Sequence, residues 1–151
     1  APRRWSAPCS TACSSCCAIQ APTAAVRSIP AWASSSERVA QRIELESTAA
    51  NAWFEARIES PDAHRATMQV DLDWTCAGWQ RSARVEPGAW STAWSIPFAA
   101  LGAKPPAPGT RWRANFFRID RHAGGHYSAW SPTHATPPDF HLPHHFGHLL
   151  F

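Results

Sequence analysis

Apolar and polar residues alternate along residues 109–133, GTRWRANFFRIDRHAGGHYSAWSPT, with the period of two that is typical of β-strands. Every second residue from Trp112 to Phe116 is apolar, and the residues between them are polar. The alternation slips at Phe117, which predicts either a β-bulge or an aromatic side chain left exposed. Residues 123–125, Ala-Gly-Gly, favour a turn, after which the pattern resumes. The stretch therefore predicts a β-hairpin.

The same period recurs in shorter stretches of the chain. In chain order the further predicted strands are 38–46, 53–59, 66–72, 79–86, 90–96 and 146–151. Pro87 and Gly88 predict a tight hairpin connection between two of these strands. Pro97 and Gly102 predict one short helical turn over 97–102, because proline suits the first helical position and glycine the position after the last. Many short strands separated by turns predict an all-β fold, an antiparallel β-sandwich of jelly-roll type.

The N-terminal quarter of the chain differs from the rest, so we predict an irregular or disordered segment over 1–37 and a β-sandwich domain over 38–151. The first segment is rich in Ala, Ser, Pro and Cys and shows neither a helical nor a strand period. A zinc site or disulfides are alternatives for its four cysteines, Cys9, Cys13, Cys16 and Cys17. Another hypothesis is that the segment is truncated or translated out of frame, since its composition is typical of a shifted GC-rich reading frame.

Composition limits the classes of partner. Apolar residues make up 44% of the 151 residues, which is ample for one core, and only 17% are charged. The net charge of +3 is spread over strands that also carry acidic residues, so we expect no nucleic-acid partner. No apolar run is long enough for a transmembrane helix, and no signal peptide is visible, so we expect no membrane partner. Nine tryptophans supply core residues and stacking surfaces for flat apolar ligand faces.

Four motifs in order carry a resemblance to a known family: Trp-x-Ile-Pro-Phe-x-x-Leu-Gly (94–102), Pro-x-Pro-Gly-x-x-Trp-Arg-x-Asn-Phe-x-Arg (106–118), Tyr-Ser-Ala-Trp-Ser-Pro-Thr (127–133) and Phe-His-x-Pro-x-x-Phe-Gly-x-Leu-x-Phe (140–151). Together they resemble the family 9-like carbohydrate-binding domains. Residues 42–46 and 52–56 look like that family's middle strands. The resemblance covers about residues 38–151.

The resemblance implies a β-sandwich that binds a mono- or oligosaccharide without cleaving it, so we expect a protein that is not an enzyme. Such domains are usually exported, which implies an extracellular or periplasmic location, and are often attached to glycoside hydrolases in polysaccharide breakdown. The better-understood members clamp a sugar between two aromatic rings and carry structural calcium. One clamp aromatic precedes the closing Pro-x-x-Phe-Gly, and Phe140 stands there in this chain. The other comes from the N-terminal part, where this sequence departs from the family.

Phe140 is therefore the first candidate for the stacking face, and the alternative is that it packs the Pro-rich loop. Polar groups must also reach the sugar hydroxyls. Glu44 matches a polar contact of the family on a middle strand. The other candidates are Asn115 and Arg113 on the polar side of the central strand, Trp53 on another polar face, and Trp130, for which core packing, as for Trp112, is the main alternative.

Two other classes of function stay open at this stage. Five histidines cluster near the C-terminus, namely His134, His141, His144, His145 and His148. Pro143 rules out a helix across them. One alternative is a haem- or metal-binding sandwich in a redox or sensor assembly, with Met68 and a C-terminal histidine as axial ligands. The other alternative is a purely structural or interaction module. For catalysis, the acidic residues offer no pair in a recognisable motif.

Overall fold

The computed structural model describes residues 14–20, 41–61, 65–120 and 126–151, and for 14–20 it describes the backbone alone. In chain order the strands are β1 (Ser14–Gln20), β2 (Gln41–Thr48), β3 (Trp53–Glu59), β4 (Gln69–Asp71), β5 (Gln80–Glu86), β6 (Ala89–Ser95), β7 (Arg111–Asp120), β8 (His126–Ala129) and β9 (Gly147–Leu150). Three short 3₁₀ segments accompany them: η2 (Arg65–Thr67), η3 (Phe98–Leu101) and η5 (Pro143–His145). No helix in these ranges is long and apolar enough to cross a membrane.

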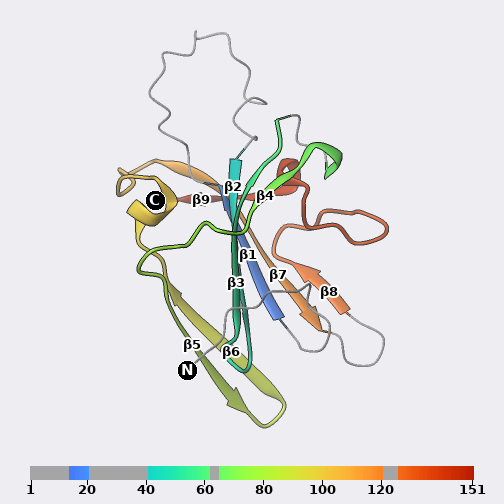
Figure 1. Cartoon of the computed structure of the whole chain (residues 1–151). Helices are drawn as coiled ribbons and strands as arrows, with labels where there is room; N and C mark the ends of the chain where they lie inside the picture. Colours follow the sequence, from blue (N-terminus) through green and yellow to red (C-terminus); the bar gives the residue numbers. More distant parts are fainter. Residues whose placement is uncertain (1–13, 21–40, 62–64, 121–125) are drawn as a thin grey trace, which may run out of the picture.

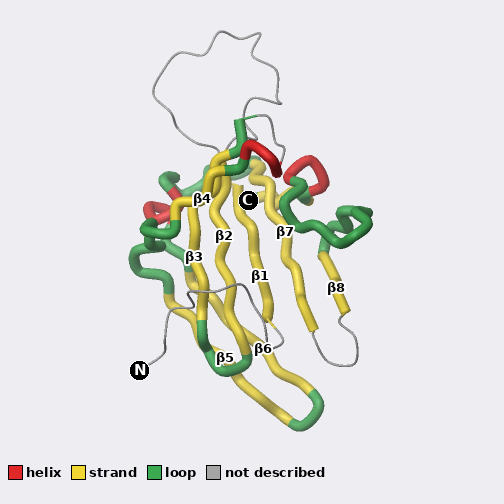
Figure 2. The backbone as a smooth tube through the Cα atoms, turned by 45° about the vertical axis from the view of Figure 1, so that its right-hand side comes forward, coloured by secondary structure: helices red, strands yellow, loops and turns green. Residues whose placement is uncertain are grey.

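The strands form a large sheet and a hairpin packed against it, which confirms the antiparallel all-β sandwich (Figures 1 and 2). The seven-stranded sheet has the order β4-β3-β2-β1-β7-β8, and β9 also pairs with β7. β8 and β9 follow one another along one edge of β7, because β1 occupies the other edge. β5 and β6 form the second sheet. All pairings are antiparallel.

The face of the large sheet turned toward β5 and β6 is called the hairpin face. Its core is a cluster of buried apolar side chains: Ile43, Leu45, Cys76, Trp79, Leu101 and Trp112. The indole Nε1 of Trp94 on β6 donates to Ser47 Oγ on β2 at 3.0 Å, which ties the hairpin to the sheet. The indoles of Trp79 and Trp94 meet edge to face at 5.4 Å. Burial of these large side chains supplies most of the stabilisation of the sandwich.

The opposite face is called the loop face, because the chain between β8 and β9 lies against it. A second apolar cluster forms there, in which Phe117, Ile119 and Phe146 are buried and Phe140 is partly buried. Consecutive residues of a strand point to opposite faces, so Phe116 lies on the hairpin face and Phe117 on the loop face. The pairing of β7 is continuous through both residues, so the bulge is excluded and the exposed-aromatic alternative is confirmed. Phe116 is 45% exposed and Phe117 is 3% exposed.

Local signals in the sequence were confirmed where the backbone needed a particular residue. Gly88 has φ of 75° in the two-residue connection between β5 and β6, and Gly102 has φ of 68° directly after η3. Both angles lie in the left-handed region that glycine adopts at little cost. The strand expected over 66–72 is wrong in extent, because η2 occupies its beginning and only Gln69–Asp71 pairs.

β1 was not expected, since residues 14–20 lie in the segment that showed no strand period. It nevertheless lies between β2 and β7 and connects the two halves of the large sheet. Backbone pairing can thus place a strand where the hydrophobic pattern gives no signal. The predicted limits of the two parts, 1–37 and 38–151, stay predictions, and the expected turn at 123–125 lies outside the described residues.

Candidate functional site

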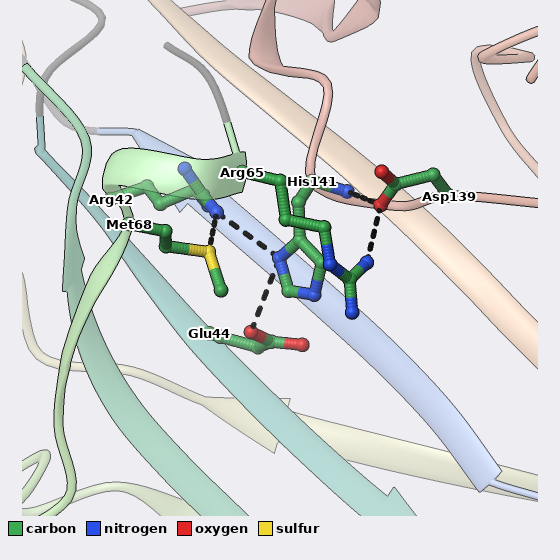
Figure 3. A network of polar contacts seen from close by, with 6 residues as sticks. All are labelled: Arg42, Glu44, Arg65, Met68, Asp139 and His141. Atoms are coloured by element: carbon green, nitrogen blue, oxygen red, sulfur yellow. Dashed lines mark hydrogen bonds and ion pairs between the residues drawn. The ribbon is translucent and has the colours of Figure 1, made fainter. Parts of the chain in front are cut away.

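A network of polar side chains lies on the loop face, where β2 meets the loop before β9 (Figure 3). The guanidinium of Arg42 donates to His141 Nδ1 at 3.0 Å and to the sulfur of Met68 at 2.9 Å. Asp139 accepts from the His141 backbone N–H at 2.9 Å and pairs with Arg65 at 3.1 Å. Three elements distant in sequence therefore converge on this one point of the sheet.

Glu44 on β2 is the acidic member of the network, with its side chain 14% exposed. Burial, the charge of Glu46 two residues along the same face, and a hydrogen bond between the two side chains together raise the pKa of Glu44 to about 7. The positive charges of Arg42 and Arg65 act in the opposite direction on this pKa. Near neutral pH, Glu44 is therefore present both as a carboxylic acid, which can donate a hydrogen bond, and as a carboxylate, which only accepts.

His141 is neutral in this setting. Burial lowers its pKa to about 4, and the charges of Arg42 and Arg65 lower it in the same direction. Its Nδ1 accepts from Arg42, so the proton of the ring is on Nε2. The 4.0 Å approach of Nδ1 to the Glu44 carboxylate is then a contact between a neutral ring and an acid, and not an ion pair.

Aromatic rings lie beside this network. Phe140, next to His141 in the chain, stacks on Phe117 with ring centroids 4.2 Å apart and an interplanar angle of 22°. Tyr127 on β8 is tilted against Phe140 at 6.0 Å and is 46% exposed. One face of Phe140 is therefore occupied by Phe117, which holds the ring in place. Phe140 is therefore partly buried against β7 and β8.

Of the predicted site residues, Glu44 lies 4.0 Å from the Nδ1 atom of His141, the residue that follows Phe140 in the chain. Arg113 and Asn115 share the loop face, but their polar groups contact backbone. Arg113 donates to the carbonyls of Pro143 and His144 at 3.3 Å each, which fixes η5. Asn115 is fully buried. Its amide nitrogen donates to Ser131 O at 2.7 Å, and its oxygen accepts from the Ser131 N–H at 2.9 Å and the Phe116 N–H at 3.0 Å.

Trp53 and Trp130 lie on the hairpin face, away from Phe140. The guanidinium of Arg81 on β5 covers the Trp53 ring at 3.7 Å, so this indole is part of the contact between the sheets. Trp130 is 51% exposed, which excludes the interpretation of it as core, whereas Trp112 is buried as expected. Tyr127 was missed as a site residue, although its place opposite Ile119 in the register puts it on the same face as Phe117.

Two observations bear on the alternatives based on metals and haem. Arg42 donates to both Met68 and His141, so one guanidinium occupies the position that a haem between these two residues would need. No group of three or more His, Cys, Asp or Glu side chains able to hold a metal occurs within 41–61, 65–120 and 126–151. The expected zinc or disulfide role of the N-terminal cysteines lies outside the described side chains.

The class of the protein follows from its antiparallel β-sandwich together with its sequence. The chain belongs to Carbohydrate-binding family 9, whose sequence profile matches residues 55–151, more than half of the chain. This match confirms the resemblance found in the sequence.

One solved structure supports the fold. The crystal structure of a candidate carbohydrate-binding protein from Bacteroides uniformis aligns with a TM-score of 0.61 and 19% sequence identity over 93% of this chain. The aligned part is 61% of that protein, so this chain spans about three fifths of its length. At this identity the similarity concerns the fold alone. Among curated proteins, none matches the chain.

Proposed function

We propose that this domain binds a mono- or oligosaccharide on the loop face, with Phe140 and Tyr127 as the aromatic contact and Glu44 and His141 as polar contacts. The observation that carries the proposal is the position of Phe140. The Phe140 ring stacks on Phe117. In the chain, Phe140 directly precedes His141, which belongs to the polar network with Arg42 of β2.

The aromatic part suits the C–H face of a sugar ring, which is apolar although its rim carries hydroxyls. The stacking on Phe117 holds Phe140 in advance, so little conformational entropy is lost on binding. Tyr127 adds a half-exposed ring at an angle of 57° to Phe140. A pyranose placed against Tyr127 and Phe140 exchanges water for apolar contact on both rings.

The polar part suits the hydroxyls. A sugar hydroxyl both donates and accepts, and the carboxyl oxygens of Glu44 can accept from it. Neutral His141 offers its Nε2–H as a donor. Arg42, which is 3% exposed, holds the His141 ring by its Nδ1 and acts as a positioning residue. These groups bind and orient a sugar, and in this proposal none of them performs a reaction.

Binding should be measured by isothermal titration of the full chain with a panel of hexasaccharides containing glucose, xylose, mannose or galactose. We expect Tyr127→Ala and Phe140→Leu to weaken binding of the recognised sugar by roughly tenfold each, because each removes a flat ring. Phe140→Leu keeps an apolar side chain against Phe117, which separates a loss of stacking from a loss of fold. Val85→Ala, at a residue 66% exposed on β5, is the matched control and should bind normally.

The proposal fails if no member of the panel binds, or if both ring variants bind with unchanged affinity. We further propose that the domain comprises residues 38–151 and binds its ligand without catalysing a reaction. In this proposal it is exported and serves a glycoside hydrolase in polysaccharide breakdown. Membership of the family supports these points. A hydrolase domain encoded on the same polypeptide or beside it is the observation that tests the last of them.

A further inference from the structure

Four exposed side chains form a second patch on the hairpin face, over β7 and the end of β8, and we call them the Trp130 patch. They are Phe116 and Arg118 on β7 together with Ser128 and Trp130 opposite them. The register pairs Arg118 with Ser128, and the Trp130 N–H donates to Phe116 O at 2.8 Å, so the four residues alternate correctly to share one face. Phe116 is 45% and Trp130 51% exposed.

The Trp130 ring rests on a glycine. A Cβ built on Gly147 would lie 2.6 Å from Cζ3 and 2.8 Å from Cη2 of the indole, so the ring occupies the space that any larger residue would fill. The indole thus lies against the backbone of β9, and its exposed half is the side away from that strand. Phe116 stands beside it, with ring centroids 5.7 Å apart and an angle of 58°. The two rings are therefore inclined to each other and lie side by side on this face.

The backbone around Trp130 is fixed on both sides. Its own N–H bonds to Phe116 O, and the next residue, Ser131, is bonded through both its N–H and its carbonyl to the buried Asn115 amide. A large aromatic side chain that is half exposed, supported from below and fixed in its backbone loses little entropy when it binds a ligand. This is the arrangement that a stacking residue requires.

Polar groups adjoin the rings. The guanidinium of Arg118 lies 5.4 Å from the Trp90 ring on β6, which directs it along the hairpin face, and it remains exposed with several N–H donors. Ser128 adds a hydroxyl across the strand pair. An apolar face with donors on one side matches the C–H face and the hydroxyl rim of a pyranose.

We propose that the Trp130 patch is a second saccharide-binding surface, separate from the loop-face site around Phe140. A pyranose stacks on the exposed side of the Trp130 indole, Phe116 contacts its edge, and Arg118 donates to its hydroxyls. Since Phe116 and Phe117 are consecutive residues of β7, the two surfaces lie on opposite faces of one sheet. One molecule can therefore hold two saccharide chains, or two segments of one long chain.

A second copy of this protein fits the patch less well. Two half-exposed aromatic side chains offer roughly 200 Å² of surface, whereas a stable protein interface buries about 800 Å² per partner. The rest of the patch is a charged guanidinium and a hydroxyl, and the cores of interfaces are depleted in charged residues.

The test follows the indole Nε1–H signal of Trp130 by two-dimensional NMR of the full chain, with the signal assigned by its absence in Trp130→Phe. The probe is the same panel of hexasaccharides. We expect this signal to shift with at least one saccharide of the panel, and to shift by the same amount in Phe140→Leu. In Arg118→Ala, the saccharide concentration that gives half of the shift should rise at least fivefold. Arg118 is exposed, so Arg118→Ala should keep the urea midpoint of the unchanged chain, and Lys104→Ala, at an exposed position outside the patch, is the control.

Three outcomes overturn the proposal: the Trp130 signal responds to no saccharide, it moves on dilution of the protein alone, which indicates self-association, or it stops responding in Phe140→Leu. A response at Trp130 with unchanged binding in Phe140→Leu and Tyr127→Ala supports the second surface and refutes the loop-face site. The two proposals therefore fail separately.

Discussion

Asn115 should be among the most important residues for stability although it is polar. It is fully buried, and its side chain makes three hydrogen bonds to backbone groups, two of them to Ser131. Each such bond contributes about 1 kcal/mol when water can replace it and more when it cannot. Asn115→Ala should therefore lower the free energy of unfolding by about 3 kcal/mol. With a urea m-value of about 2 kcal/mol/M, the midpoint should fall by about 1.5 M.

Equilibrium unfolding in urea, followed by tryptophan fluorescence, measures this change. Lys104→Ala, at an exposed position, is the control and should change stability by less than about 0.5 kcal/mol. Asn115→Asp adds a sharper test, because its carboxylate would face the Ser131 carbonyl, whereas its protonated form could donate to it. That variant should regain stability as the pH falls toward 4. A loss below about 1 kcal/mol in Asn115→Ala would show that the three bonds contribute little.

Three further predictions concern other parts of the sandwich. The pKa of Glu44 rises from 4.5 to about 7 on folding, so the native state binds more protons between these pH values and stability falls as the pH rises through them. This fall is at most about 3 kcal/mol. Glu44→Gln should remove it, which unfolding curves at pH 4.5 and pH 8 measure. Gly147→Ala should displace the Trp130 ring and shift its indole NMR signal, and an unmoved signal contradicts the contact. Burial raises the pKa of Cys76 to about 11, so in the folded protein its thiol should resist alkylation by iodoacetamide at pH 8 until urea is added. Mass spectrometry of the Cys76 peptide after digestion measures the alkylation.

Much of the fold was predictable from short-range signals. The hairpin of β5 and β6 follows from two alternating stretches joined by Pro87 and Gly88, and η3 follows from Pro97 and Gly102. In both cases a single residue type satisfies a local backbone requirement, so the signal does not depend on distant parts of the chain.

Burial on the polar sides of strands was not predictable. Arg42 and Glu55 occupy positions that alternate with apolar residues, and the pattern predicts a solvated face for them. They are 3% and 7% exposed, because the loop before β9 covers one face of the sheet and the hairpin with its connections covers the other. Glu55 accepts from the Cys76 N–H at 3.0 Å, which satisfies one oxygen of its buried carboxylate.

The candidate site was predicted in part. Glu44 and Phe140 were named from the resemblance, and Glu44 lies 4.0 Å from His141, the residue after Phe140. The sequence could not show that Asn115 is occupied by Ser131, or that Tyr127 lies beside Phe140, because both facts depend on the register of β7 with β8 and on the course of the following loop.

The sequence by itself determined the all-β class, the tight turns and the family, since these rest on period, turn residues and ordered motifs. Only the tertiary structure decided which face each aromatic ring occupies and which polar groups remain available to a ligand. The physical reason is that a shift of one residue in strand register moves every side chain to the other face, and register is set by packing between strands that are far apart in the chain.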